Sequence, residues 1–124
     1  MPKKILVTED DLDIRNLLKI ILEKNGYQVS LAANGVEALE KAESELPNLI
    51  LLDVVMPAKS GWEVCKILKS QDKTKHIPIV IFTALSLMLG KKSKGHAEEA
   101  GANGYLPKPF NENELLTEVK RYLE

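Results

Sequence analysis

Short runs of apolar residues alternate along the chain with longer segments in which apolar residues recur every three or four positions. The clearest run is residues 49–52, four large aliphatic side chains that are followed by Asp53. An unbroken run of this length is typical of a strand buried on both faces in a parallel sheet. A helix is the competing interpretation, but Pro47 and Pro57 leave too little length for one. Asp53 is therefore predicted to lie at the carboxyl end of a central strand.

The same pattern predicts four further strands and five helices. The strands are expected at residues 5–7, 27–33, 77–83 and 104–106. Four helices are expected to begin after Asp11, Asn34, Ser60 and Asn111, and a poorly patterned fifth helix near residues 94–100. Strands that alternate with helices predict one parallel sheet with helices on both faces. In such sheets, ligands bind at the carboxyl edge of the strands.

Composition narrows the class of protein. The chain has 124 residues, of which 44% are hydrophobic and 28% charged, so we expect one folded domain over residues 1–124 without an attached output domain. A net charge of −1 argues against a general binder of nucleic acid or membrane surfaces. Cys65 is the single cysteine, which excludes an internal disulfide, fits the cytoplasm and is expected to be buried. No stretch approaches the length of a signal peptide or a membrane span.

Reactive side chains collect at the predicted carboxyl edge of the sheet. In chain order they are Glu9, Asp10, Asp53, Thr83 and Lys108. Three carboxylates brought close together would repel one another unless a cation such as Mg²⁺ lay between them. A carboxylate beside such a metal can attack phosphorus and form an acyl phosphate, while an ammonium and a hydroxyl stabilise the phosphoryl oxygens. The set therefore predicts a phosphoryl-transfer site with Asp53 as the acceptor.

These motifs resemble the receiver domain of two-component response regulators, and the resemblance covers the whole chain. It rests on residues 51–57 with Gly61, Glu9-Asp10, Thr83-Ala84 and residues 108–110. The resemblance implies a flavodoxin-like α/β fold. This is a three-layer (βα)5 sandwich whose five parallel strands lie in the order 2-1-3-4-5.

The resemblance also implies a role for each site residue. Asp53 would receive a phosphoryl group from the phosphohistidine of a sensor histidine kinase or a histidine phosphotransfer protein. The cofactor would be Mg²⁺. Its expected ligands are Glu9, Asp10, Asp53 and the backbone carbonyl of Val55. The phosphoryl oxygens would be bound by Thr83, Lys108 and the backbone of Ala84.

A switch is implied as well. Thr83 would move toward the phosphate and Tyr105 would follow into the vacated space, although an aromatic residue beside a short strand is more often simple packing. The surface of the fourth helix, fifth strand and fifth helix would then change for a downstream target protein. Such a switch would turn over no separate substrate, and it would be a monomer or a weak phosphorylation-dependent dimer.

Three other functions compete with this interpretation. A phosphatase of the haloacid dehalogenase type also uses an aspartyl nucleophile, but it needs a second acid where this chain has Val55. A flavodoxin-like electron carrier would need a hydroxyl-rich phosphate loop where residues 9–11 are all acidic. A docking module that is never phosphorylated is disfavoured because Asp53, Thr83 and Lys108 are all present.

Three features depart from the usual family pattern. Glu9 stands where aspartate is more common, and its longer arm favours a water-mediated contact to the metal. Residues 85–94 form a longer segment than in most receivers, and its leucines either pack beneath the fourth helix or form a docking patch with the following lysines. Val55 and Leu85, two positions after the acceptor and the threonine, offer no group to orient a hydrolytic water. A long-lived phosphorylated state is therefore expected.

Overall fold

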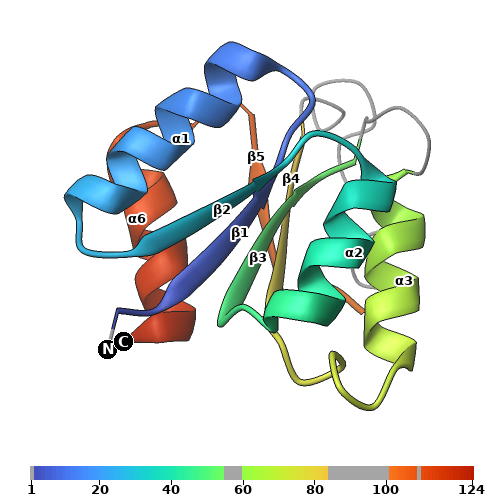
Figure 1. Cartoon of the computed structure of the whole chain (residues 1–124). Coiled ribbons are helices and arrows are strands. Elements are labelled where there is room, and N and C mark those ends of the chain that lie inside the picture. The colour runs from blue at the N-terminus through green and yellow to red at the C-terminus, as the bar shows by residue number, and fades with distance from the viewer. Residues whose placement is uncertain (1, 55–59, 84–100, 109) are drawn as a thin grey trace.

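The computed structural model of the chain describes residues 2–54, 60–83, 101–108 and 110–124, without the side chain of Thr83. Within these residues there are five strands and four helices, drawn in Figure 1. They are β1 (Lys4–Thr8), α1 (Leu12–Lys24), β2 (Gln28–Ala32), α2 (Gly35–Glu45), β3 (Leu49–Asp53), α3 (Gly61–Ser70), β4 (Ile79–Thr83), β5 (Gly104–Pro107) and α6 (Glu112–Leu123). The helix expected near residues 94–100 lies outside the described part of the chain.

All five strands are parallel and lie in the order β2-β1-β3-β4-β5, which confirms the predicted sheet. In Figure 1, α1 and α6 cover one face of the sheet, and α2 and α3 cover the other. β3 lies at the centre, and all five of its residues are buried. Its side chains alternate between the two faces, so that Leu49 and Leu51 join the core beneath α1 and α6, while Ile50 and Leu52 join the other core.

Local capping chemistry sets where three helices begin. One Asp11 carboxylate oxygen accepts the N–H groups of Asp13 and Ile14, 2.9 and 3.1 Å away, and so caps α1. At the start of α6 both halves of a capping box form between Asn111 and Glu114. At the start of α2 the side chain of Asn34 accepts the N–H of Glu37 at 2.9 Å, while the Glu37 carboxylate pairs with Lys41.

Two apolar residues that recur at helical spacing with the buried ones are exposed. Leu17 in α1 is 55% exposed and Val36 in α2 is 44% exposed. Each helix covers the sheet with a narrow stripe, which in α1 is centred on the buried Leu18 and Leu22. Residues that lie a quarter turn away from that stripe reach solvent.

β4 begins at Ile79, two residues later than the pattern predicts. Pro78 has no N–H to donate, although its carbonyl accepts the N–H of Ile50 in β3, 3.0 Å away. Asn103 then fixes the start of the strand: its side-chain oxygen accepts the N–H of Ile79 at 3.0 Å, and its own N–H donates to the carbonyl of Ile79 at 2.8 Å. None of the described helices has the length and apolar character that crossing a membrane requires.

Candidate functional site

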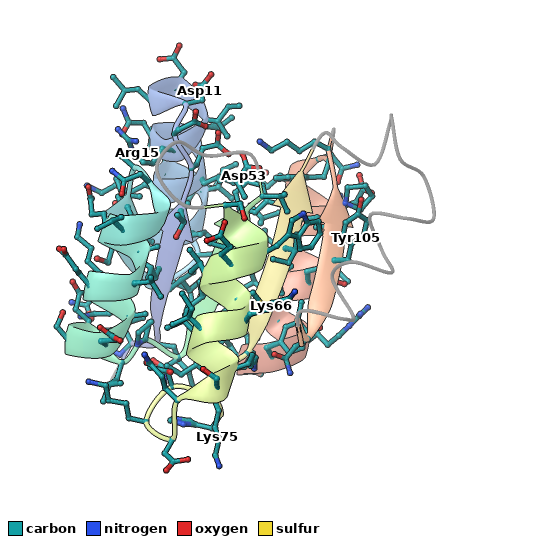
Figure 2. The ribbon with its side chains drawn as sticks, turned by 90° about the vertical axis from the view of Figure 1, so that its right-hand side faces the viewer. Asp11, Arg15, Asp53, Lys66, Lys75 and Tyr105 are labelled. Carbon is teal, nitrogen blue, oxygen red and sulfur yellow. The ribbon has the colours of Figure 1, made fainter. Side chains whose placement is uncertain are left out.

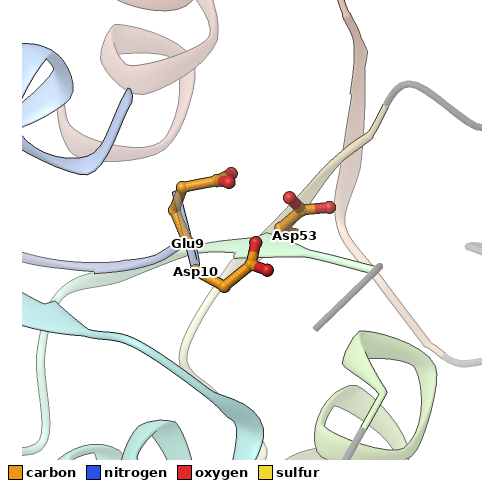
Figure 3. Close-up of side chains that lie close together, drawn as sticks. All are labelled: Glu9, Asp10 and Asp53. Carbon is orange, nitrogen blue, oxygen red and sulfur yellow. The ribbon is translucent and has the colours of Figure 1, made fainter. Parts of the chain in front are cut away.

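Three carboxylates meet at the carboxyl edge of the sheet. Thr8 of β1 pairs with Leu52 of β3, so Glu9 and Asp10 leave the sheet beside Asp53. One oxygen from each carboxylate lies within 4.8 Å of the others, and Figure 3 shows the three side chains. Glu9 and Asp53 are only 2% and 4% exposed, whereas Asp10 is open to solvent. The cluster is therefore buried on one side and accessible on the other.

Lys108 brings a positive charge to this cluster from the end of β5. Its ammonium donates to Oδ2 of Asp53 at 3.1 Å and to Oε2 of Glu9 at 2.9 Å. The same nitrogen lies 5.0 Å from the ring centre of Phe82 in β4. Phe110 supports that ring edge to face, with ring centres 6.0 Å apart. Aromatic contacts thus hold the lysine arm over β4 and aim it at Asp53.

Burial and the neighbouring charges shift the pKa values of Glu9 and Lys108. Burial raises the pKa of the Glu9 carboxyl to about 7, and its hydrogen bond with Asp53 adds to this shift, while Lys108 opposes it. Burial alone would lower the pKa of Lys108, but its bond to Glu9 and the charge of Asp53 outweigh burial and raise it. The ammonium therefore stays charged at neutral pH, although one cation does not balance three carboxylates. A divalent cation with a preference for oxygen ligands, such as Mg²⁺, fits this donor set.

Gly61 allows α3 to begin directly against the end of β3. Its N–H donates to the carbonyl of Val54 at 3.0 Å. A Cβ at this position would lie 2.8 Å from the Cα of Val54 and would overlap the carbonyl oxygen of Asp53. Sequence reasoning named Gly61 as a motif residue and as part of a helix start, but it did not predict this close backbone approach, because the approach depends on the path of the chain between residues 54 and 61.

Arg15 is a site residue that sequence reasoning missed. Its guanidinium donates to the backbone carbonyl of Glu9, and the N···O distance is 2.9 Å. Figure 2 shows Arg15, Asp11 and Asp53 at the same end of the molecule, opposite Lys75. An arginine in the first turns of a helix is usually solvated. No signal in the sequence marks it as an anchor for the acidic loop.

The structure describes only some of the remaining predicted site residues. Thr83 is the last residue of β4 and pairs with Pro107 of β5. Tyr105 in β5 packs against the core beneath α2 and α3, and its hydroxyl is buried with no hydrogen-bond partner among the described residues. The predictions that concern Val55, Ala84 and residues 85–94 fall outside the described residues.

Comparison with known sequences identifies the family to which the chain belongs. Residues 5–120 match the family model of the response regulator receiver domain. The chain is 44% identical to the alkaline phosphatase synthesis transcriptional regulatory protein PhoP of Bacillus subtilis, over 99% of this chain and 49% of PhoP. It is 34% identical to the polar-differentiation response regulator DivK of Brucella anthropi, over 99% of this chain and 98% of DivK. The chain thus spans about half of PhoP and nearly all of DivK.

Solved structures agree with this result. The chemotaxis protein CheY4 of Vibrio cholerae superimposes with a TM-score of 0.90 and 34% identity, over 98% of this chain and 99% of CheY4. The receiver domain of a sensor histidine kinase from Pseudomonas aeruginosa was solved with a magnesium ion in its active site cleft. It superimposes with a TM-score of 0.89 and 29% identity, over 99% of this chain and 98% of that domain. With the predicted sheet order and the gathered acids and lysine, these matches place the chain in the response regulator receiver domain family of two-component phosphorelay systems.

Proposed function

We propose that Asp53 is the phosphoryl acceptor of this receiver and that Mg²⁺ is its cofactor. The observation that carries the proposal is the ammonium of Lys108, which lies 3.1 Å from Asp53 and faces a cluster of three carboxylates. Asp10, Asp53 and Glu9, with the backbone carbonyl of Val55, form the expected binding site for the metal. When bound there, Mg²⁺ would neutralise charge on the incoming phosphoryl group.

The transfer itself needs only this chain's carboxylate and a phosphohistidine donor. An Asp53 oxygen forms a bond to phosphorus while the bond from phosphorus to the donor imidazole nitrogen breaks. The imidazole keeps the electron pair of the broken bond and leaves. Lys108 and the hydroxyl of Thr83 bind the phosphoryl oxygens.

The donor is a sensor histidine kinase or a histidine phosphotransfer protein that docks on α1. Leu12 and Ile20, two turns apart on this helix, are 57% and 63% exposed, and Leu17 is 55% exposed. Exposed apolar clusters mark interaction surfaces, and this one begins directly after the acidic loop of the site. A donor helix seated here brings its phosphohistidine to Asp53.

Phosphorylation then changes the surface that β5 and α6 form with the helix expected near residues 94–100, and a downstream target binds there. Thr83 moves toward the phosphoryl group and Tyr105 follows. The buried hydroxyl of Tyr105, which lacks a partner among the described residues, supports this movement because an unsatisfied buried hydroxyl is costly. Residues 1–124 act as one cytoplasmic receiver domain and turn over no separate substrate.

Intact mass spectrometry after incubation with a small phosphodonor tests this function. Wild-type protein with Mg²⁺ should gain the mass of one phosphoryl group, and Asp53→Asn should gain none. Chelation of the metal should also prevent the gain. A phosphatase of the competing kind would instead release phosphate continuously, a reaction for which Val55 offers no acid.

A further inference from the structure

The dipeptide Asn-Gly occurs three times in this chain, at Asn25-Gly26, Asn34-Gly35 and Asn103-Gly104. Asparagine loses its side-chain amide most readily in this dipeptide, because glycine has no Cβ to hinder attack by its own backbone nitrogen. The attack requires that nitrogen to reach the side-chain carbonyl carbon of the asparagine. How fast each dipeptide reacts therefore depends on how firmly the fold holds it.

The dipeptide at the start of α2 is held by a helix cap. Oδ1 of Asn34 accepts the N–H of Glu37 at 2.9 Å, and its backbone carbonyl accepts the N–H of Ala38 at 3.0 Å. Gly35 is buried. To turn its side-chain carbonyl carbon toward the nitrogen of Gly35, Asn34 would have to give up the cap and open the first turn of α2.

The dipeptide at the start of β5 is held by two other elements. Asn103 exchanges two hydrogen bonds with Ile79 of β4, at 2.8 and 3.0 Å. Its carbonyl accepts the hydroxyl of Tyr122 in α6 at 2.8 Å. The same hydroxyl would lie 2.5 Å from a Cβ on Gly104, so this glycine is crowded. Reaction here requires β5 to separate from both β4 and α6.

Asn25-Gly26 follows the last residue of α1, and its hydrogen bonds to the described residues all go to that helix. The side-chain nitrogen of Asn25 donates to the carbonyl of Ile21 at 2.8 Å. The N–H of Gly26 donates to the carbonyl of Glu23 at 3.1 Å, a bond between residues three apart, whose geometry is poorer than that of an α-helical bond. Both residues are exposed, and nothing beyond the neighbouring residues lies within 4 Å of a Cβ built on Gly26. Fraying of the last helical turn is thus enough to free this dipeptide.

We propose that Asn25 is a modification site of this chain, at which spontaneous deamidation produces aspartate and isoaspartate. The nitrogen of Gly26 loses its proton and forms a bond to the side-chain carbonyl carbon of Asn25. The bond from that carbon to the side-chain nitrogen breaks, and this nitrogen takes up the proton and leaves as ammonia. Water then opens the five-membered succinimide ring. Opening at one carbonyl carbon gives aspartate, and opening at the other gives isoaspartate, in which the main chain runs through the former side-chain carbon.

Both products place a carboxylate beside the last carbonyl groups of α1. The carbonyl of Ile21 loses the amide donor and faces a negative charge, at the end of the helix that already carries the negative pole of its dipole. Isoaspartate also lengthens the main chain just before Tyr27, whose hydroxyl donates to Glu124. Deamidation therefore weakens the junction of α1 with β2. The acidic cluster lies beyond the other end of this 13-residue helix, about 20 Å away, and is left intact.

Peptide mass spectrometry of the full chain at mildly alkaline pH measures the rate at which each dipeptide loses its amide. Native protein is compared with protein unfolded in guanidinium, in which the fold protects none of the three, so each site serves as a control for the others. In native protein Asn25 should react no more than about tenfold slower than in unfolded protein, because a helix end opens easily, whereas Asn34 and Asn103 should react at least about a hundredfold slower.

Ammonia release from native protein gives an independent measure of the same reaction. Asn25→Gln keeps a side-chain amide, but its longer arm closes a ring far more slowly, so most of the early ammonia should disappear. Asn16→Gln is the matched control, because Asn16 is exposed on the same helix and is followed by leucine. It should release ammonia at the wild-type rate.

Asn25→Asp reproduces one of the two products. It should lower the melting temperature by about 1–4 °C, as expected for one carboxylate at the negative end of a helix. A melting temperature at or above that of the wild type would overturn the proposed effect of the modification. The site itself would be overturned if Asn34 or Asn103 lost its amide faster than Asn25 in native protein, or if all three were protected equally.

Discussion

The hydroxyl of Thr8 is fully buried at the end of β1, one residue before the acidic pair. Among the described residues it has no hydrogen-bond partner. A hydroxyl that is desolvated without a partner costs about 1–3 kcal/mol. Thr8→Val keeps the branched shape and removes this cost, so it should raise the free energy of unfolding by about 1 kcal/mol in a urea titration. A drop in stability would show that the hydroxyl has a partner after all.

Cys65 illustrates how burial controls reactivity at the level of one residue. Burial raises the pKa of its thiol to about 11, with the charge of Lys69 opposing the shift. The folded state therefore favours the protonated thiol. The stability that this contributes is complete below the unfolded pKa of about 9 and is lost as the pH rises through about 11.

At pH 7, alkylation of Cys65 by iodoacetamide should accordingly be much slower in native protein than in protein unfolded by guanidinium. Mass spectrometry over time gives both rates. Equal rates in the two states would mean that the thiol is not protected by the fold.

At the scale of single elements, α1 has a buried apolar face that packs on the sheet and an exposed apolar face. Leu18 and Leu22 pack on the sheet, while Leu12 and Ile20 remain exposed and form the proposed docking surface. Leu12→Ser with Ile20→Ser should slow transfer from a phosphorylated histidine phosphotransfer protein at least about tenfold, because the buried apolar contact is lost. Transfer from a small phosphodonor should stay at the wild-type rate, since the site itself is intact.

The matched control for this prediction is Leu46→Ser, which removes an exposed leucine at the far end of α2. It should leave both transfer rates unchanged. An equal loss with the protein donor and the small phosphodonor would show that the α1 substitutions damage the site rather than the docking surface.

Elements that depend on local chemistry could be predicted from the sequence. Asp11 and Asn111 cap their helices as expected, because a cap needs only neighbours along the chain. The exposure of Leu17 could not be predicted, since periodicity alone does not give the width of the buried stripe. Arg15 and Gly61 have roles that depend on how the loops before their helices fold back, which the periodicity of apolar residues does not reveal.

At the scale of the whole molecule, the sheet gathers residues that are far apart in sequence. The proximity of Glu9, Asp10, Asp53 and Lys108 could be predicted because the carboxyl ends of parallel strands share one edge. The contacts of the Glu9 carboxylate could not be predicted, because they depend on where Lys108 and the N–H of Asp11 lie in the folded chain.

Cation binding at this edge should stabilise the entire fold. A ligand that binds only the folded state raises the free energy of unfolding by about 2.7 kcal/mol at a hundredfold excess over its dissociation constant. Millimolar Mg²⁺ should therefore raise the melting temperature of the wild type, and a chelator should reverse the increase. Asp10→Asn should show a much smaller change. A wild-type melting temperature that does not respond to Mg²⁺ would contradict the binding of Mg²⁺ at this site.

If Asp53 carries the phosphoryl group, chemical reduction of the acyl phosphate should mark that residue. Borohydride reduces an aspartyl phosphate to homoserine, a stable mark that peptide mass spectrometry assigns to one residue. After incubation with a small phosphodonor and Mg²⁺, we expect homoserine at position 53 and at neither position 9 nor position 10. Homoserine at another acidic residue, or at none while Mg²⁺ is bound, would contradict it.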